Sequence, residues 1–334
     1  MGTKYLTACL HAFGFPPDLR VEERESAPLG KKEVRLEMLF APINPADLNV
    51  LEGKYGLLPE LPGEVGNEGV GRVVEIGASV GDVRVGDFAL PLNRRTWANR
   101  LVVSDSEAVF FDQEKFAGID LQQLSMLSVN PLTAYAMLTA EDELKPGDWI
   151  VQNASNSGVG RSVIQIASLL GFKTLSVVRR PELLEELRRL GGDIVVTEET
   201  DLRKEIENLT GGQRAKLALN AVGGASALNL ANALAFGSRH LTYGAMGRQP
   251  VKIPNGLLLF QQLRFEGFWM TRWAEERTAR ERNFIFQKLA AWVKEGKIVQ
   301  PVHSLHRLND LSAALAEAAK DQRRGKILLD LRSA

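Results

Sequence analysis

The sequence predicts an α/β protein in which a doubly wound parallel sheet, with helices on both faces, is joined to a β-rich domain. Three observations lead to this fold class. Short strand-like runs punctuated by glycine and proline fill residues 6–103, strand and helix patterns alternate over residues 149–243, and a small-residue turn at 154–160 opens that alternation. Runs of the first kind are typical of antiparallel sheets, and the alternation is typical of parallel ones.

The N-terminal part is expected to consist mainly of antiparallel strands. Its runs are short, rich in β-branched or aromatic residues, and bounded by glycine or proline. They lie at residues 6–13, 34–40, 69–76, 87–90 and 99–103. From residue 121 the apolar spacing becomes helical.

The second half is expected to alternate strand and helix. Strands are predicted at 149–153, 173–178, 194–197, 216–221 and 238–243, and helices at 159–170, 182–190, 201–209 and 225–235. Helices at 279–295 and 311–319 precede a last strand at 326–331, which most simply returns to an existing sheet. We therefore expect residues 123–266 to form the doubly wound domain, and residues 1–122 and 267–334 to form the β-rich domain.

The turn after the strand at 149–153 indicates a dinucleotide site. It reads Ala-Ser-Asn-Ser-Gly-Val-Gly, with Asn156, Ser157, Gly158 and Val159 at the start of the following helix. In such βαβ units the pyrophosphate binds at the helix N-terminus. The turn lacks a full G-x-G-x-x-G pattern, so an ordinary βαβ unit without a ligand is the alternative reading.

Arg179 and Arg180 end the next strand, where an NAD-binding protein would be expected to carry an acidic residue for the ribose hydroxyls. Two guanidinium groups suit a 2′-phosphate instead. The sequence therefore favours NADPH as the cofactor.

Composition narrows the possible partners and the compartment. Basic and acidic residues number 41 each, which argues against a nucleic-acid partner or a polybasic membrane surface, and no apolar stretch approaches a membrane span. The single cysteine, Cys9, can form no internal disulfide, which indicates a reducing compartment. The N-terminus lacks both a signal peptide's apolar block and an Arg/Ser-rich transit helix, so we expect a cytoplasmic protein, or a mature form whose leader has been removed.

Residues 42–77 add a second signature, which includes Gly-Asn-Glu-Gly at 66–69. Together with the dinucleotide unit, this segment resembles the medium-chain dehydrogenase/reductase superfamily, whose members join a β-rich GroES-like catalytic domain to a Rossmann domain. Zinc alcohol dehydrogenases of that superfamily have Gly-His-Glu where Asn67 stands here, and the expected cysteine position is Pro45. Zinc needs thiolate, imidazole or carboxylate ligands, so we expect no metal.

Among zinc-free members, the chain most resembles the mitochondrial-type trans-2-enoyl thioester reductases. Four segments carry the resemblance, at residues 44–61, 129–135, 152–160 and 267–273. The resemblance implies NADPH-dependent reduction of enoyl-CoA or enoyl-acyl carrier protein, and it implies a homodimer.

The resemblance also assigns residue roles. Tyr55, in Tyr-Gly-Leu-Leu-Pro, stands at the family's catalytic tyrosine, and a phenol can stabilise or protonate the enolate that hydride addition creates. Trp269 stands at a tryptophan that borders the nicotinamide and acyl site. The plainer readings are a tyrosine that packs a loop and a tryptophan that packs in a core or an interface.

The remaining expected contacts are to the cofactor. Asn130 begins a helix that it could cap, and residues 243–246 follow a parallel strand, where doubly wound sheets bind ligands. Lys326 matches a lysine near the family's cofactor, although a solvated strand-edge lysine is the rival reading. The full expected set outside the turn and the two arginines is Asn130, Tyr243, Gly244, Ala245, Met246, Phe268, Met270, Thr271 and Lys326.

Two other functions stay open on the sequence. One is an NADPH-dependent quinone or activated-alkene oxidoreductase of the same superfamily, which shares hydride transfer but not thioester recognition. The other is a non-catalytic NADPH-binding protein.

Overall fold

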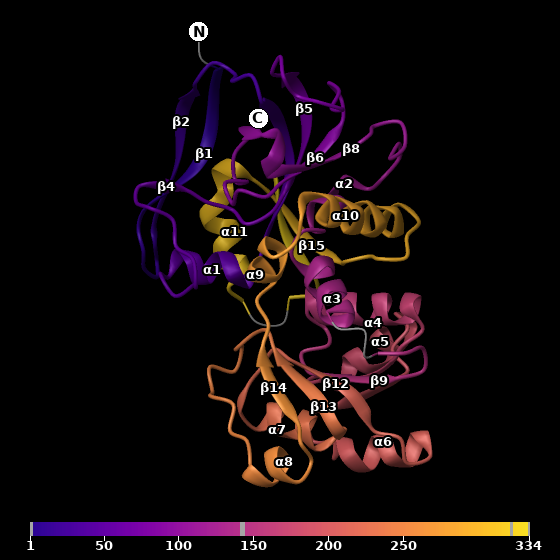
Figure 1. Ribbon diagram of the computed structural model, residues 1–334. Helices are drawn as coiled ribbons and strands as arrows, with labels where there is room; N and C mark the ends of the chain where they lie inside the picture. The colour runs from indigo at the N-terminus through magenta and orange to yellow at the C-terminus, as the bar shows by residue number, and fades with distance from the viewer. Residues whose placement is uncertain (1–2, 141–143, 321–322, 333–334) are drawn as a thin grey trace. The chain divides into compact units, whose positions relative to one another are not determined.

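The computed structural model describes residues 3–140, 144–320 and 323–332. The chain divides into two compact units, which are considered separately (Figure 1). The first unit combines Met1–Val129 with Thr278–Ala334, and the second unit is the continuous stretch Asn130–Arg277. Within the described residues, no helix is both long enough and apolar enough to cross a membrane.

Two sheets form the first unit. A three-stranded sheet has the order β2-β1-β4, and a seven-stranded sheet has the order β15-β16-β3-β5-β6-β8, with β7 paired to β3. The strands are β1 (Thr3–Ala12), β2 (Asp18–Ser26), β3 (Glu33–Ile43), β4 (Gly63–Glu64), β5 (Val70–Ile76), β6 (Phe88–Pro91), β7 (Arg100–Ser104), β8 (Ala108–Phe111), β15 (Val302–Arg307) and β16 (Lys326–Asp330). All pairs are antiparallel except β15 with β16. The last strand returns to an existing sheet, as predicted.

The core of the first unit joins residues from both ends of the chain. Leu36 and Met38 of β3 and Ile327 and Leu329 of β16 are completely buried in one apolar cluster with Trp97. The helices are α1 (Pro45–Leu51), α2 (Leu121–Ser125), α10 (Ala279–Lys294) and α11 (Leu311–Ala318), with short 3-10 turns at Asp105–Glu107 and Leu308–Asp310.

A single parallel sheet forms the second unit, with the order β11-β10-β9-β12-β13-β14. The strands are β9 (Trp149–Gln152), β10 (Lys173–Val178), β11 (Ile194–Thr197), β12 (Ala215–Asn220), β13 (Leu234–Thr242) and β14 (Arg264–Gly267). The order reverses between β9 and β12, and doubly wound sheets bind dinucleotides at such a reversal, outside the carboxyl ends of the strands. The predicted fold class is confirmed.

The helices of the second unit connect these parallel strands, except that α3 precedes the first strand and α9 follows the last. They are α3 (Asn130–Thr139), α4 (Gly158–Leu170), α5 (Leu184–Arg189) after a 3-10 turn at Pro181–Leu183, α6 (Leu202–Thr210), α7 (Gly224–Asn232), α8 (Asn255–Leu259) and α9 (Met270–Glu275). Helix α4 shows why they form. Ser157 caps its start, Val163 and Ile166 bury its apolar face, and Gly171 ends it with φ of 80°.

Candidate active site

The turn before α4 has the geometry of a phosphate cradle. The Ser157 hydroxyl accepts a hydrogen bond from the Gly160 amide at 3.1 Å, which starts the helix. A Cβ on Gly160 would lie 2.6 Å from the Ser155 Cα, so only glycine permits this close approach of turn and helix. Asn156 is exposed at the apex, and Gly158 and Val159 begin the helix, where amides point out of the N-terminus. The turn therefore fits a pyrophosphate although it lacks two of the usual glycines.

A carboxamide pair, Asn153 and Asn220, joins the carboxyl ends of the two central strands. The Asn153 Nδ2 donates to the Asn220 Oδ1 at 2.9 Å, and the Asn153 Oδ1 accepts from the Ala221 amide at 2.7 Å. The Asn220 Nδ2 in turn donates to the Thr242 Oγ1 at 3.2 Å. Sequence analysis missed both residues, although a polar side chain at the end of an apolar strand was a usable signal.

Residues 243–246 lie against this pair. The Tyr243 amide donates to the Asn220 carbonyl at 3.0 Å, and the Met246 amide donates to the Ala221 carbonyl at 2.8 Å. Burial raises the pKa of the Tyr243 phenol above its usual range, and Ser157 of the α4 turn partly offsets the rise. Gly244 is half-buried, and Ala245 and Met246 are exposed. The second unit thus brings the 154–160 turn and the 243–246 segment together.

Arg179 and Arg180 directly follow β10, which neighbours β9 in the sheet. Arg179 is exposed, and the Arg180 guanidinium lies 3.7 Å from the Glu182 carboxylate. Both follow the carboxyl end of β10, which runs parallel to β9, and so lie at the same edge of the sheet as the α4 turn.

We expect the two arginines to decide the choice of cofactor. The double variant Arg179→Ala/Arg180→Ala should lose at least about tenfold in kcat/KM for NADPH, mainly through KM, and little for NADH. A matched control is Arg188→Ala/Arg189→Ala, because these arginines pair with Glu185 on the exposed face of α5. The measurement is kcat/KM with NADPH and with NADH for the wild-type protein and both double variants. A wild-type protein without a preference for NADPH would refute the assignment of the two arginines to the 2′-phosphate.

The remaining predicted residues of the second unit lie near α3 and α9, which pack against each other. Asn130 is buried at the first position of α3. Trp269 precedes α9 and is 42% exposed, while Phe268, Met270 and Thr271 beside it are half-buried. The Phe268 amide donates to the Thr242 carbonyl at 2.9 Å, which connects this segment to the end of β13, directly before Tyr243.

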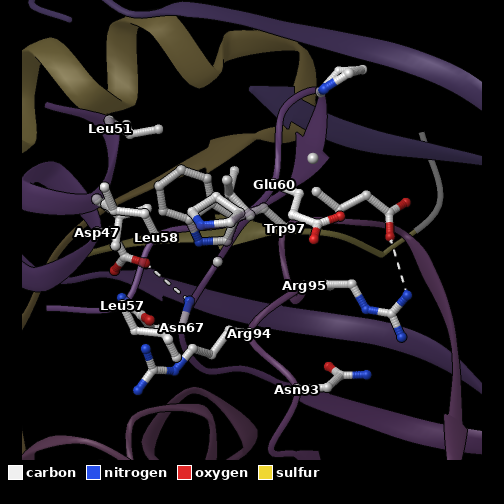
Figure 2. Close-up of a pocket in the computed structure, with 17 residues that line it drawn as sticks. Asp47, Leu51, Leu57, Leu58, Glu60, Asn67, Asn93, Arg94, Arg95 and Trp97 are labelled. Carbon is white, nitrogen blue, oxygen red and sulfur yellow. Dashed lines mark hydrogen bonds and ion pairs between the residues drawn. The ribbon is translucent and has the colours of Figure 1, made fainter. Parts of the chain in front are cut away.

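In the first unit, Tyr55 lies four residues after α1 and is half-buried. The Arg94 guanidinium lies 5.7 Å from the centre of its ring. Arg94 also lines an adjacent pocket of about 370 Å³, shown in Figure 2. The pocket walls are largely apolar, formed by Val50, Leu51, Leu57, Leu58, Pro59, Pro62 and Trp97, and its polar lining includes Asp47, Glu60, Glu64, Asn67, Asn93, Arg94 and Arg95.

A buried polar cluster, composed of Asn44, Asp47, Glu68 and Lys326, reaches this pocket through Asp47. The Asn44 Nδ2 donates to the Glu68 Oε1 at 2.7 Å, and the Lys326 ammonium donates to the Asn44 Oδ1. Asp47 accepts from the Asn44 and Asn67 amides at 2.7 and 2.9 Å. The cluster therefore links α1, the 66–69 loop and β16.

Burial shifts the titration of this cluster. It raises the pKa of Glu68 to about 7 and that of Asp47 to about 6, and it lowers the pKa of Lys326 to about 8. The opposite charges of Lys326 and the two carboxylates counter these shifts. Sequence analysis missed Asn44 and Asp47, although Asn-Pro-Ala-Asp is a usable sign of a capped helix start.

Comparison with known proteins decides the family. Residues 30–104 match the alcohol dehydrogenase GroES-like domain, and residues 158–284 match the zinc-binding dehydrogenase family. The chain is 43% identical over 296 residues to the mitochondrial enoyl-[acyl-carrier-protein] reductase of Xenopus tropicalis, covering 86% of this chain and 83% of that protein. The Homo sapiens protein of the same name is 40% identical over 309 residues, with 90% and 82% covered. The chain belongs to the mitochondrial-type enoyl thioester reductases.

Solved structures agree with this family. An enoyl thioester reductase from Candida tropicalis, in a mutant form, has a TM-score of 0.88 at 32% identity, covering 98% of this chain and all of that one. Etr1p in complex with NADP and crotonyl-CoA has a TM-score of 0.87 at 30% identity, with 98% and 100% covered. A Bacillus thuringiensis protein assigned as an NADPH:quinone reductase has a TM-score of 0.90 at 29% identity, with 98% and 99% covered.

For an enoyl thioester reductase of this family, the prediction of a cytoplasmic protein is wrong. The matching relatives from Xenopus tropicalis, Homo sapiens and Dictyostelium discoideum are all named as mitochondrial. The prediction depended largely on the composition of the first residues of the chain, which does not decide the compartment. The zinc-free assignment within the medium-chain dehydrogenase/reductase superfamily is confirmed.

Proposed function

We propose that this protein reduces the α,β-double bond of trans-2-enoyl thioesters, as enoyl-CoA or enoyl-acyl carrier protein, with NADPH. The observation that carries the proposal is the similarity over nearly the whole chain to Etr1p, whose structure contains NADP and crotonyl-CoA. The relatives' name, enoyl-[acyl-carrier-protein] reductase, supports the same chemistry.

The second unit supplies the groups for the cofactor. The proposed phosphate contacts are Asn156, Ser157, Gly158, Val159, Arg179 and Arg180, and the other proposed contacts are Asn130, Tyr243, Gly244, Ala245, Met246, Phe268, Met270 and Thr271. The tight approach at Gly160 and the helix N-terminus beside it support a pyrophosphate. When bound, NADPH supplies a hydride. Lys326, in the buried cluster of the first unit, is also proposed as a cofactor contact.

Tyr55 is proposed as the catalytic acid, with Trp269 bordering the reacting group. Addition of hydride at the β-carbon places negative charge on the α-carbon and the thioester oxygen. The Tyr55 O–H bond then breaks as its proton bonds to the α-carbon, and water returns a proton to the phenolate. The apolar walls of the adjacent pocket would receive an acyl chain, because burial of each methylene contributes about 0.8 kcal/mol.

One steady-state experiment tests the reaction class. With NADPH in excess, the purified protein is assayed on crotonyl-CoA, 2-decenoyl-CoA and a naphthoquinone. We expect kcat/KM to be at least about a hundredfold higher for one of the thioesters than for the quinone. The similarity to the Bacillus thuringiensis protein makes quinone reduction the second candidate. Faster quinone reduction would favour it, and NADPH binding without any turnover would favour the non-catalytic alternative.

We also propose a homodimer that forms through the edge of the second unit's sheet. Strand β14 is last in the strand order, and Phe236, Leu259 and Phe260 beside it are 62%, 67% and 78% exposed. A cluster of large exposed apolar side chains is typical of an interface. The Etr1p/Etr2p heterodimer shows that a similar protein pairs with a second chain.

Disruption of this surface should separate the subunits. We expect the wild-type protein to sediment as a dimer and Leu259→Asp/Phe260→Asp to sediment as a monomer at micromolar concentration, because burial of two carboxylates is strongly unfavourable. Phe284→Asp is the control, since Phe284 is equally exposed but lies on α10 of the first unit. A monomeric wild-type protein, or a control that also dissociates, would contradict the proposal.

A further inference from the structure

Arg94 has an unfavourable backbone conformation beside the proposed catalytic residue. Its φ is 57°, in the left-handed region that glycine and asparagine tolerate and that long side chains rarely adopt. It follows β6 and lies between Asn93 and Arg95. Because glycine and asparagine adopt this φ more readily, either residue at position 94 would relieve the strain. Strain of this kind persists where surrounding structure enforces it, and it is concentrated at functional sites.

The unusual backbone directs Arg94 away from its neighbour. In Figure 2 the side chains of Arg94 and Arg95 extend in opposite directions. The Arg95 guanidinium lies 3.7 Å from the Glu64 carboxylate, whereas the Arg94 guanidinium lies over the Tyr55 ring. An arginine over an aromatic face is attracted by the ring's negative potential and restricts its orientation.

We propose that Arg94 is a positioning residue that acts through Tyr55, an inference that rests on the proposed function. Its guanidinium holds the phenol ring in the orientation needed for proton transfer. Its positive charge also stabilises the phenolate that remains when the Tyr55 O–H bond breaks and the α-carbon gains the proton. Water then reprotonates the phenolate, so the step consumes no further reagent. The strained turn is retained because it places this charge at the ring.

A double-mutant cycle tests whether Arg94 acts through Tyr55. Arg94→Ala should lower kcat on crotonyl-CoA about tenfold in the wild-type background and less than about twofold in the Tyr55→Phe background. Arg94→Lys should recover part of the loss, because it keeps the charge. Arg72→Ala is the control, since Arg72 also lies over a ring, Phe88, at 5.5 Å in the same unit but outside the pocket. Equal losses in both backgrounds would overturn the role of Arg94, whereas a fully active Tyr55→Phe variant would overturn the proposed function itself.

The strain provides a second, independent measurement. Arg94→Gly should raise Tm by about 2 °C, since glycine adopts this φ without cost, and should still lower kcat about tenfold. Gln262→Gly is the matched control, because Gln262 is exposed with φ of 48°. It should raise Tm similarly with unchanged kcat. An Arg94→Gly variant that keeps wild-type kcat would overturn the proposal.

Discussion

Replacement of Tyr55 by phenylalanine is expected to lower kcat on crotonyl-CoA about a hundredfold, because the variant cannot deliver the proton that the α-carbon must gain. Affinity for NADPH should stay within about twofold, since all but one of the proposed cofactor contacts lie in the second unit. The measurement is steady-state turnover with saturating NADPH, combined with cofactor titration by fluorescence. A solvent deuterium effect on kcat that disappears in the variant would identify the phenol as the donor.

Tyr5→Phe is the control for this variant. The Tyr5 hydroxyl donates to Glu64 at 2.9 Å in the same unit, so its removal also deletes one phenolic hydrogen bond. We expect kcat to change by less than about twofold. If Tyr55→Phe retained full turnover, the proton would have to come from elsewhere.

Replacement of Lys326 by methionine should have the largest effect on stability. The variant leaves the buried Glu68 carboxylate without its cation, and removal of one partner of a buried pair typically costs about 3–5 kcal/mol. The full loss is expected at pH 7.5, where Glu68 is mostly ionised and Lys326 is still mostly protonated. At pH 5.5, Glu68 is protonated in the folded protein and the loss should be at most about half as large. Urea unfolding at both pH values measures the difference.

The sign of this pH dependence follows from the shifted pKa values. Because the pKa of folded Glu68 is about 7, above the ordinary 4.5, its contribution to stability is present below pH 4.5 and is lost as pH rises to 7. The pKa of folded Lys326 is about 8, below 10.5, so its contribution is present above pH 10.5 and is lost as pH falls to 8. The pair is therefore least favourable between pH 7 and 8. Without Lys326, the pKa of Glu68 should rise further.

The double variant Glu68→Gln/Lys326→Met separates charge from packing. Glutamine retains an oxygen to accept the Val129 amide, which Glu68 binds at 2.8 Å, and it needs no cation. We expect the double variant to recover at least about 2 kcal/mol of the loss at pH 7.5. An equal loss in both variants, or a loss in Lys326→Met that does not change with pH, would contradict the electrostatic explanation.

Strong local patterns made most of the fold predictable. Helix α4 has a capping serine, an apolar face and a terminal glycine, so its bounds of Gly158–Leu170 differ from the prediction by one residue. Strand β2 was not predicted, because six of its nine residues are charged and only Leu19 and Val21 are apolar. It forms because β1 pairs with it in antiparallel orientation along its whole length, from Thr3 opposite Ser26 to Ala12 opposite Asp18. Tertiary pairing of this kind overrides local propensity.

The site was predictable where a residue's role depends on a motif. Tyr55 and the 154–160 turn belong to recognisable segments, and they lead to the roles proposed above. Asn153 and Asn220 are 67 residues apart and matter because two parallel strands bring their side chains together. The position of Arg94 could not be predicted, because no local pattern reveals a positive φ. Contacts that form only on folding could not be predicted from the sequence.

The buried cluster also has a consequence for the order in which the protein is made. Lys326 contacts Asn44 across 282 positions of the chain, and β16 completes the sheet beside β3. The second unit is one uninterrupted stretch, so a ribosome finishes it while the first unit still lacks its last strand. During synthesis, the cofactor-binding half can thus fold before the half that carries Tyr55. Until the C-terminal strand emerges, Glu68 has no counter-ion, and the nascent first unit depends on protonation or on solvent to accommodate that carboxylate.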